Sequence, residues 1–342
     1  MTARRLLVVT DAWAPQTNGV VTTWQQVIRH LPECGYTATI AHPGSHRTFA
    51  MPGYAEIRLA VDPWKLSSRI EQADPDAIHV VTEGPLGIAA RRWCVRHHVP
   101  FTTSVHTKFP EYVAERSPLS PAAGYAYLRW FHRHSSRVLA MSASHAEELA
   151  ANGLTNLNVW LGGVDTARFR PMARTRRTRP RLLYAGRVAV EKNLEAFLEL
   201  DLDADKVVVG DGPHRSALET RFPDVQWLGY KRGDALTREF SDADVFVFPS
   251  RTDTFGLVML EANACGTPVA AYPVTGPMDL IRTGENGVLH DDLTTAVQRA
   301  LAVDRHTCRL TALERTWAAT TNSLVKLLAP AKHATERRTA NG

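Results

Sequence analysis

The sequence of 342 residues has few cysteines and no Cys-x-x-Cys pair: its cysteines are Cys34, Cys94, Cys265 and Cys308. Cysteines scattered in this way indicate neither a disulfide framework nor a thiolate metal site. We therefore expect reduced thiols that serve only in packing.

Long apolar runs are also missing. No stretch approaches the ~18 apolar residues that span a membrane, and the apolar segment in MTARRLLVVTDAW is too short for a secretory signal peptide. We expect a soluble, cytoplasmic protein. Its hydrophobic content of 44% allows a large core, and its length predicts two domains.

Two hallmarks of other protein classes are absent. The first apolar run is followed by DAWAPQTNGVV, where a dehydrogenase would have Gly-x-Gly-x-x-Gly. A basic surface with interleaved aromatic side chains, as nucleic-acid binding needs, is approached only in residues 124–137. The net charge of +5 favours an anionic partner, and nucleic acid, anionic lipid and phosphorylated ligands remain open.

The sequence does contain many short apolar runs of strand-forming residues, separated by helical stretches. Runs of this kind are typical of parallel strands buried on both faces, so we predict two α/β layered domains in tandem. The expected strands are RLLVVT, TATIAHP, AIHVVT, FTTSVH and RVLAMS in the first domain, and RLLYAG, KVVVG, VQWLG, VFVFPS and PVAAY in the second.

The expected boundary lies in FRPMARTRRTRPR, residues 169–181, which has prolines, a basic run and no apolar periodicity. Such a segment predicts a solvated linker, with a nucleic-acid-binding arm as the alternative. We place the domains at residues 1–170 and 171–342. The amphipathic last helix, LERTWAATTNSLVKLL, fits against either domain.

Open parallel sheets bind ligands at the carboxyl ends of their strands, so the loops after the strands should carry the chemistry. Arg187 and Lys192 follow RLLYAG, before a helix expected near Asn193, and suit a phosphate or a diphosphate. A surface ion pair with Glu191 is the alternative. Gly210 and Gly212 follow KVVV, where glycine permits close approach of a ligand or a plain tight turn.

The loop after VFVFPS is RTDTFG, and a helix should begin near Gly256. The amides of Phe255, Gly256 and Leu257 would then form an anion site together with Thr254. Asp253 in the loop and Glu261 in the helix are separated by seven residues. Carboxylates placed in this way can accept hydrogen bonds from hydroxyls at the two ends of one ligand, or can simply be surface charges.

In order and spacing, GRVAVEKN, VGDGP and PSRTDTFGLVMLEANACGTPVAA resemble the donor half of the retaining glycosyltransferases of family four. DAWAPQTNGVVTTW, TEGPLG and SVHTKFPEY resemble that family's loops in the other half. The resemblance covers nearly the whole chain and implies the GT-B fold, in which two Rossmann-like domains face each other across a cleft. The first domain would bind the acceptor and the second the nucleotide-sugar donor.

The resemblance also implies roles for the residues of the second domain. Arg187 and Lys192 would bind the donor diphosphate, Glu261 the ribose, and Asp253 with the following amides the hexose. The family's usual pattern has two glutamates, so the shorter Asp253 is a departure, and its contact with the sugar is either direct or through water.

In the first domain the resemblance implies that Gly19 approaches the diphosphate and that His106 lies beside the reacting sugar. Cations and helix amides can stabilise a leaving diphosphate, so we expect no metal and no cofactor. Three Asp-x-Asp stretches might suggest a metal site instead, but none follows a strand into the cleft, and we interpret all three as turns and caps: 74–76, 201–203 and 242–244.

The acceptor prediction rests on residues 124–139, where Arg129, Arg133 and Arg137 would share one helical stripe. Such a stripe suits an ordinary solvated helix face or an anionic membrane surface at the inner side of the membrane. The motifs NGVVTT, TEGPLG and HTKFPEY resemble those of bacterial enzymes that glycosylate diacylglycerol or phosphatidylinositol.

We therefore predict a metal-independent, retaining hexosyltransferase with a lipid acceptor such as diacylglycerol and a front-face mechanism. UDP-glucose or UDP-glucuronate is the favoured donor and GDP-mannose the second. The alternatives are a non-lipid acceptor, a sugar-nucleotide epimerase, or a non-enzymatic binder of nucleic acid or other anions.

Overall fold

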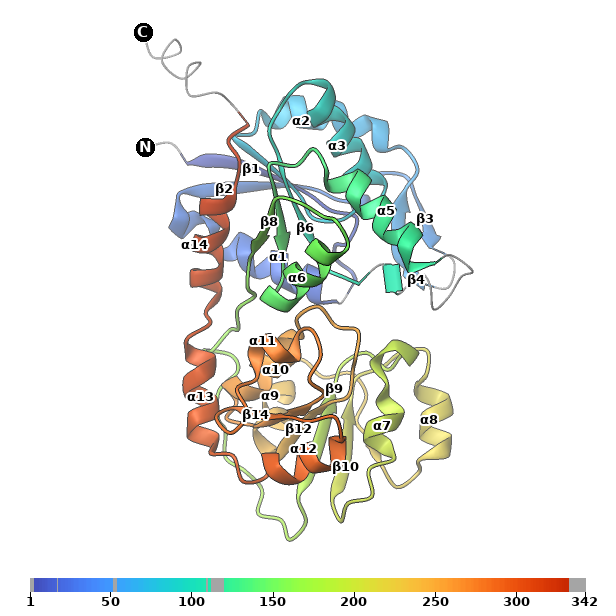
Figure 1. Ribbon diagram of the computed structural model, residues 1–342, viewed down its shortest axis with the longest axis vertical. Coiled ribbons are helices and arrows are strands. Elements are labelled where there is room, and N and C mark those ends of the chain that lie inside the picture. Colours follow the sequence, from blue (N-terminus) through green and yellow to red (C-terminus); the bar gives the residue numbers. More distant parts are fainter. Residues whose placement is uncertain (1–2, 17, 52–53, 109, 112–119, 332–342) are drawn as a thin grey trace. The chain divides into compact units, whose positions relative to one another are not determined.

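The computed structural model describes residues 3–16, 18–51, 54–108, 110–111 and 120–331 (Figure 1). The chain forms two compact units, one of Met1–Leu161 with Trp317–Gly342 and the other of Gly162–Thr316. Each unit is α/β, as the sequence predicted.

The first unit is built on a six-stranded parallel sheet in the order β2-β1-β5-β6-β7-β8. A separate antiparallel hairpin consists of β3 and β4. The strands are β1 (Arg4–Val9), β2 (Tyr36–Ala41), β3 (Thr48–Met51), β4 (Tyr54–Ala60), β5 (Ala77–Val80), β6 (Thr102–Val105), β7 (Arg137–Ala140) and β8 (Leu157–Val159).

Helices cover this sheet, and the last of them arrives from the far end of the chain. The indole Nε1 of Trp160 donates to the Thr320 carbonyl at 3.0 Å, and Arg137 donates to the Leu327 carbonyl at 2.9 Å. These bonds tie α14 to the first unit. The helices are α1 (Gly19–His30), α2 (Leu66–Ala73), α3 (Pro85–Arg96), α5 (Pro121–His132), α6 (Ala143–Ala151) and α14 (Trp317–Leu327), with short 3-10 turns at η1 (Leu31–Cys34), η2 (Pro43–Ser45) and η3 (Pro63–Lys65).

The second unit has its own six-stranded parallel sheet, in the order β11-β10-β9-β12-β13-β14. Its strands are β9 (Arg181–Ala185), β10 (Asp205–Val209), β11 (Gln226–Trp227), β12 (Val245–Phe248), β13 (Val269–Ala271) and β14 (Gly287–Leu289). Its helices are α7 (Leu194–Leu198), α8 (Arg215–Arg221), α9 (Gly233–Asp242), α10 (Leu257–Ala264), α11 (Pro277–Leu280), α12 (Leu293–Ala300) and α13 (Arg305–Leu313), with a 3-10 turn at η4 (Val190–Lys192).

The ten strands expected from apolar runs are all present. The reason is visible in β9 and β12, in which every residue is buried because helices cover both faces of the sheet. Four further strands, β3, β4, β8 and β14, were not expected. β8 and β14 have three residues each, and β11 and β13 are no longer than these but lie within the longer apolar runs VQWLG and PVAAY.

The division between the units comes before Gly162, earlier than the expected boundary after Arg170. Residues just after Gly162 already bond to the second unit, because Thr237 donates to the Arg168 carbonyl and Ser241 to the Arg170 carbonyl. The second unit also ends at Thr316, so Trp317 and the residues after it return to the first unit.

The basic segment 169–181 is exposed at residues 173–179, as expected from its composition, but it lies within the second unit and does not link the two units. Asp242 accepts from the Thr175 amide at 2.7 Å and pairs with Arg177, while Arg181 pairs with Glu239 at 2.6 Å. The Arg181 side chain is only 7% exposed. Three of its cations, Arg174, Arg177 and Arg181, therefore pair with acids of α9 and of the turn that follows it.

Candidate active site

The second sheet has a topological switch point between the neighbouring strands β9 and β12. From β9 the chain continues to β10 on one side, and from β12 it continues to β13 on the other side. The loop after β9 carries Arg187 and Lys192, and the loop after β12 carries Asp253. The structure joins two of these residues, because the Lys192 Nζ lies 2.6 Å from Asp253 Oδ1. Both side chains are largely buried, at 26% and 21% exposure.

Further hydrogen bonds fasten the two loops to each other. Asn193 has a left-handed backbone conformation (φ 51°), and its side-chain amide donates to the Pro249 carbonyl at 3.0 Å. The Thr252 hydroxyl donates to the Glu191 carbonyl at 3.3 Å. The Lys192–Asp253 pair is thus held by backbone anchors on both sides, which positions its charges before any ligand binds.

The remaining cation of the β9 loop, Arg187, is partly buried and has an anchored backbone. The Tyr184 hydroxyl, which belongs to β9, donates to the Arg187 carbonyl at 2.7 Å. Burial beside the carboxylates Asp253 and Glu191 raises the pKa of Tyr184, so the phenol stays protonated and keeps this bond. The helix expected near Asn193 is present as α7 but has only five residues, so the cations and not a long helix dipole supply the positive charge.

Gly210 and Gly212 are required by contacts within the protein. A Cβ on Gly210 would lie 1.9 Å from the Gly186 carbonyl oxygen, and a Cβ on Gly212 would lie 2.3 Å from the Val188 carbonyl oxygen. The backbone after β10 therefore packs directly against the β9 loop. This packing accounts for both glycines of VGDGP without either of the two interpretations made from the sequence, the approach of a ligand or a plain tight turn.

The loop after β12 turns into α10 as expected, with Gly256 in the left-handed region (φ 84°) directly before Leu257. Thr254 and Phe255 are buried at 7% and 3% exposure. The loop 274–276 packs against this turn, since a Cβ on Gly276 would lie 3.0 Å from the Asp253 carbonyl oxygen. Gly276 was not among the residues predicted from the sequence, although TGP after a strand indicates a tight turn.

Glu261 lies in the second turn of α10 and is partly buried. Removal from water raises its pKa to about 7, and the charge of Arg168 opposes this shift only in part. A carboxyl group with such a pKa changes its protonation state near neutral pH. Perturbed groups beside a switch point are candidates for ligand contacts.

In the first unit, α1 begins at Gly19, and the Asn18 side chain caps it by accepting from the Val21 amide at 3.0 Å. A Cβ on Gly19 would meet no atom within 4 Å. Internal packing therefore does not explain this glycine, unlike Gly210 and Gly212. Open space at a helix N-terminus is compatible with an anionic group close to the backbone.

His106 follows β6 and is held by a chain of polar side chains. Its Nε2 lies 3.3 Å from the donating Trp24 Nε1 and 2.9 Å from the Ser104 hydroxyl, which in turn lies 3.0 Å from His79 Nε2. Burial lowers the pKa of His106 to about 3, so the ring is neutral at physiological pH. An indole N–H can only donate, so Nε2 acts as acceptor and the proton belongs on Nδ1.

The residues that position His106 were missed by the sequence analysis. Thr102, Ser104 and His106 alternate in TTSVH, and alternate residues of a strand share one face. Asp11 was missed as well. It follows β1 and accepts from the Leu86 and Gly87 amides at 2.9 and 3.3 Å, so it caps the start of α3. This cap explains TEGPLG, because a Cβ on Gly84 would collide with Asp11 at 2.5 Å.

The chain matches two family models in succession. Residues 17–168 match the model described as Glycosyltransferase Family 4, and residues 179–303 match the one described as Glycosyl transferases group 1. A GDP-mannose-dependent alpha-mannosyltransferase of Mycolicibacterium smegmatis is 31% identical, and the alignment covers 94% of this chain and 96% of that protein. The chain belongs to glycosyltransferase family four.

Two further comparisons agree with this assignment. A GDP-mannose-dependent alpha-(1-6)-phosphatidylinositol dimannoside mannosyltransferase of Mycobacterium tuberculosis is 27% identical, covering 87% of this chain and 86% of that one. The solved structure of sucrose-phosphate synthase from Thermosynechococcus elongatus has a TM-score of 0.78 and 17% identity, over 99% of this chain and all of that chain. The GT-B fold class and the assignment as a glycosyltransferase are confirmed.

Some features expected from the sequence are described by the structure only in part or differ from the expectation. The motif SVHTKFPEY is described only in part, since Phe109 and Tyr112 lie outside the described residues. The described part of the chain contains no group of three or more His, Cys, Asp or Glu side chains that could hold a metal ion. Of the Asp-x-Asp stretches, Asp74 ends α2 and Asp203 is exposed, but Asp242 and Asp244 accept hydrogen bonds from the basic segment and are not solvated turns.

The expected basic stripe of Arg129, Arg133 and Arg137 is wrong. Helix α5 ends at His132, with Arg133 as its cap, and Arg137 is the first residue of β7. Arg129 and Arg137 donate to the carbonyls of Asn152 and Leu327, each at 2.9 Å. The turn at 133–136 breaks the helical period on which the stripe depended.

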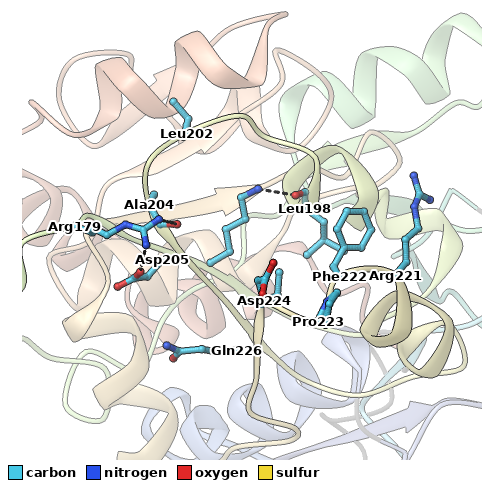
Figure 2. A pocket seen from close by; sticks show the side chains of 12 residues that line it. Arg179, Leu198, Leu202, Ala204, Asp205, Arg221, Phe222, Pro223, Asp224 and Gln226 are labelled. Atoms are coloured by element: carbon cyan, nitrogen blue, oxygen red, sulfur yellow. Dashed lines mark hydrogen bonds and ion pairs between the residues drawn. The ribbon is translucent and has the colours of Figure 1, made fainter.

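A pocket of about 340 Å³ lies elsewhere in the second unit, around Lys206 (Figure 2). It is lined by the first residues of β10 and β11 and by the ends of α7 and α8. This is the amino edge of the sheet, whereas the Lys192–Asp253 pair follows the carboxyl ends of the strands. Lys206 donates there to the Leu198 and Leu200 carbonyls, both at 2.6 Å, and so closes the end of α7. The pocket is not part of the candidate active site.

Proposed function

We propose that this glycosyltransferase transfers a hexose from a nucleotide-diphosphate sugar to a lipid acceptor, without a metal and with retention at the anomeric carbon. The observation that carries the proposal is the preorganised Lys192–Asp253 pair beside Arg187 at the switch point of the second sheet. Ligands of open α/β sheets bind at such a point.

The two members of the pair would have different tasks. Lys192 and Arg187 would stabilise the negative charge that grows on the leaving diphosphate, which is the main electrostatic demand of the reaction. Asp253, whose position is fixed by Lys192, would accept from hydroxyls of the hexose, together with the amides of residues 255–257. The short aspartate suits this arrangement because it already reaches the lysine at 2.6 Å.

The other candidate residues complete the assignment. Glu261 would accept from the ribose diol, and the backbone at Gly19 would approach the diphosphate. His106, neutral and with its proton on Nδ1, would donate to the donor sugar. Retention would follow a front-face route, in which a diphosphate oxygen takes the acceptor proton and no protein nucleophile is needed.

For the donor we propose GDP-mannose ahead of UDP-glucose or UDP-glucuronate. The sequence motifs alone favoured the uridine donors, but both curated relatives described above are named for GDP-mannose. One of them is also named for a phosphatidylinositol dimannoside, which supports a lipid acceptor. A lipid with an inositol-mannose headgroup and diacylglycerol are the acceptors to compare.

The experiment measures thermal stabilisation by GDP, UDP, ADP and their sugars in EDTA, followed by transfer to phosphatidylinositol mannoside and diacylglycerol. We expect stabilisation by guanine nucleotides and transfer of mannose. Arg187→Met should lower kcat/KM about 100-fold. The matched control Arg221→Met removes an exposed arginine that pairs with Glu195 and Glu199 on the same unit, and should leave kcat/KM unchanged.

Three outcomes would contradict the proposal. Equal activity of Arg187→Met and wild type would place the diphosphate elsewhere. Loss of transfer in EDTA, restored by a divalent cation, would refute the metal-independent route. Hydrolysis or epimerisation of the donor with no acceptor present would favour the epimerase alternative.

A further inference from the structure

The β3–β4 hairpin of the first unit lies outside the six-stranded sheet and has two unlike faces. Its register pairs Thr48 with Ala60 and Phe49 with Leu59, and the Val61 amide extends it by donating to the Arg47 carbonyl at 2.9 Å. Because side chains alternate along a strand, Phe49, Leu59 and Val61 share one face. Ala60 belongs to the other face.

The two faces differ in burial. Ala60 is 3% exposed and belongs to the core of the first unit, so its face is the inner one. On the outer face Phe49 is 47% and Val61 44% exposed, and Trp64, three residues beyond Val61, is 69% exposed. We call Phe49, Leu59, Val61 and Trp64 the hairpin surface. The register brings Phe49, Leu59 and Val61 together, and Trp64 follows close in sequence, in η3. Grouped apolar side chains mark an interaction site more often than isolated ones do.

The charge around the hairpin surface is positive. Arg47, which lies opposite Val61, and Lys65 are exposed, whereas the exposed Arg58 belongs to the face of Ala60. Among the described side chains of residues 43–70 the single acid is Asp62, which is 3% exposed. It accepts from the Arg47 amide and the His46 ring, each at 3.1 Å, and pairs with Lys65 at 2.7 Å. Asp62 is thus satisfied within the protein, while the exposed Glu71 lies just beyond this range and the side chain of Glu56 in β4 lies outside the described ones.

We propose that the hairpin surface docks the first unit on an anionic lipid bilayer. Tryptophan and phenylalanine insert at the level of the headgroups, and arginine and lysine nearby gain from anionic lipids. Among the described residues no helix is long and apolar enough to cross a membrane. The proposal rests on the proposed lipid acceptor and replaces the contact expected at Arg129, Arg133 and Arg137.

The test is co-sedimentation of the full chain with vesicles of phosphatidylcholine containing 30% phosphatidylglycerol. The variant Phe49→Ser/Val61→Thr/Trp64→Ser keeps every charge, and its changes are at exposed positions, so its melting temperature should match wild type. We expect its partition coefficient to fall at least 10-fold. The matched control, Met278→Ser/Leu310→Ser/Leu313→Ser, changes three comparably exposed side chains of the second unit and should sediment like wild type.

Several results would overturn the proposal. They are failure of wild type to sediment, equal sedimentation with pure phosphatidylcholine, or no difference between the hairpin variant and wild type. If the hairpin variant instead abolished self-association in gel filtration and left vesicle binding intact, the surface would be a protein interface.

Donor binding separates this proposal from the proposed function. Stabilisation by a nucleotide needs no bilayer and should be the same in the hairpin variant and wild type. Absence of nucleotide binding in both would count against the proposed function, whereas intact nucleotide binding without vesicle binding would count against the hairpin surface alone.

Discussion

Glu261 shows how burial changes the chemistry of a single residue. Its pKa rises from 4.5 to about 7 because the carboxylate loses water on folding, and Arg168 compensates only in part. The folded state therefore binds the proton more tightly than the unfolded state does. Ionised Glu261 thus lowers the free energy of unfolding, and this destabilisation is nearly absent below pH 4.5 and complete above pH 7. A binding residue of this kind lowers stability at the pH where its charge is needed.

The loss of stability with rising pH gives a prediction for Glu261→Gln, which removes the charge and keeps the shape of the side chain. At pH 8 the free energy of unfolding of the second unit should exceed that of wild type by up to about 3 kcal/mol, and the difference should shrink toward pH 4.5. Amide hydrogen exchange of β12 at several pH values measures it. Glu199→Gln, at an exposed glutamate of the same unit, is the control, and it should not increase the free energy of unfolding. A pH-independent difference would refute the raised pKa.

At the scale of elements, the basic segment 169–181, which we call the strap, is bound to the surface of the second unit by hydrogen bonds and ion pairs with α9. Asp242, at the end of α9, accepts from the Thr175 amide and pairs with Arg177 and Arg181. Because Arg181 begins β9, the strap also fixes the entry to the strand that leads to Arg187 and Lys192. An acid far from the reacting groups thereby helps to place the site.

Asp242→Asn should consequently destabilise the second unit by about 1–2 kcal/mol, since it removes the carboxylate that pairs with Arg177 and the more distant of the two carboxylates beside the buried Arg181, which keeps Glu239. Asp203→Asn offers a matched control in another Asp-x-Asp stretch. The Asp203 side chain is 88% exposed and its ion pair with Arg179 is solvated, so the change should be below about 0.5 kcal/mol. Denaturant unfolding followed by far-UV circular dichroism compares the two, and equal effects would show that the strap contributes nothing.

At the scale of the whole molecule, the chain crosses between its units twice, and α14 completes the unit in which the chain began. Leu324 is fully buried in that unit, and Trp160 and Arg137 bond to the backbone of α14. The last helix is therefore part of the core of the first unit and not an appendage of the second.

Leu324→Ala should lower the stability of the first unit by about 2–5 kcal/mol, as deletion of a fully buried leucine does. The first unit contains every tryptophan of the chain except Trp227, so tryptophan fluorescence follows its unfolding selectively. Leu310→Ala, at a residue of α13 that is 48% exposed, should leave this transition unchanged. A fluorescence transition at the wild-type position in Leu324→Ala would show that α14 does not stabilise the first unit.

The sequence by itself determined ten of the twelve strands of the two sheets, the α/β class and the loops that carry the candidate site. It could do so because strands buried on both faces need continuous apolar runs, and because loops after parallel strands meet at one edge. The start of α10 was also predictable, since glycine before an apolar helical run indicates a left-handed turn at Gly256.

Only the tertiary structure decided which partners these residues take. Lys192 and Asp253 are 61 positions apart in the sequence. The residues next to Asp242 along the chain gave no reason to expect more than a solvated turn there. The break between Arg133 and Arg137, the acceptance by His106 from Trp24, and the return of α14 likewise depend on segments distant in sequence. Local patterns encode burial and backbone preference, whereas ion pairs, tautomers and domain membership depend on which distant segments the strand order brings together.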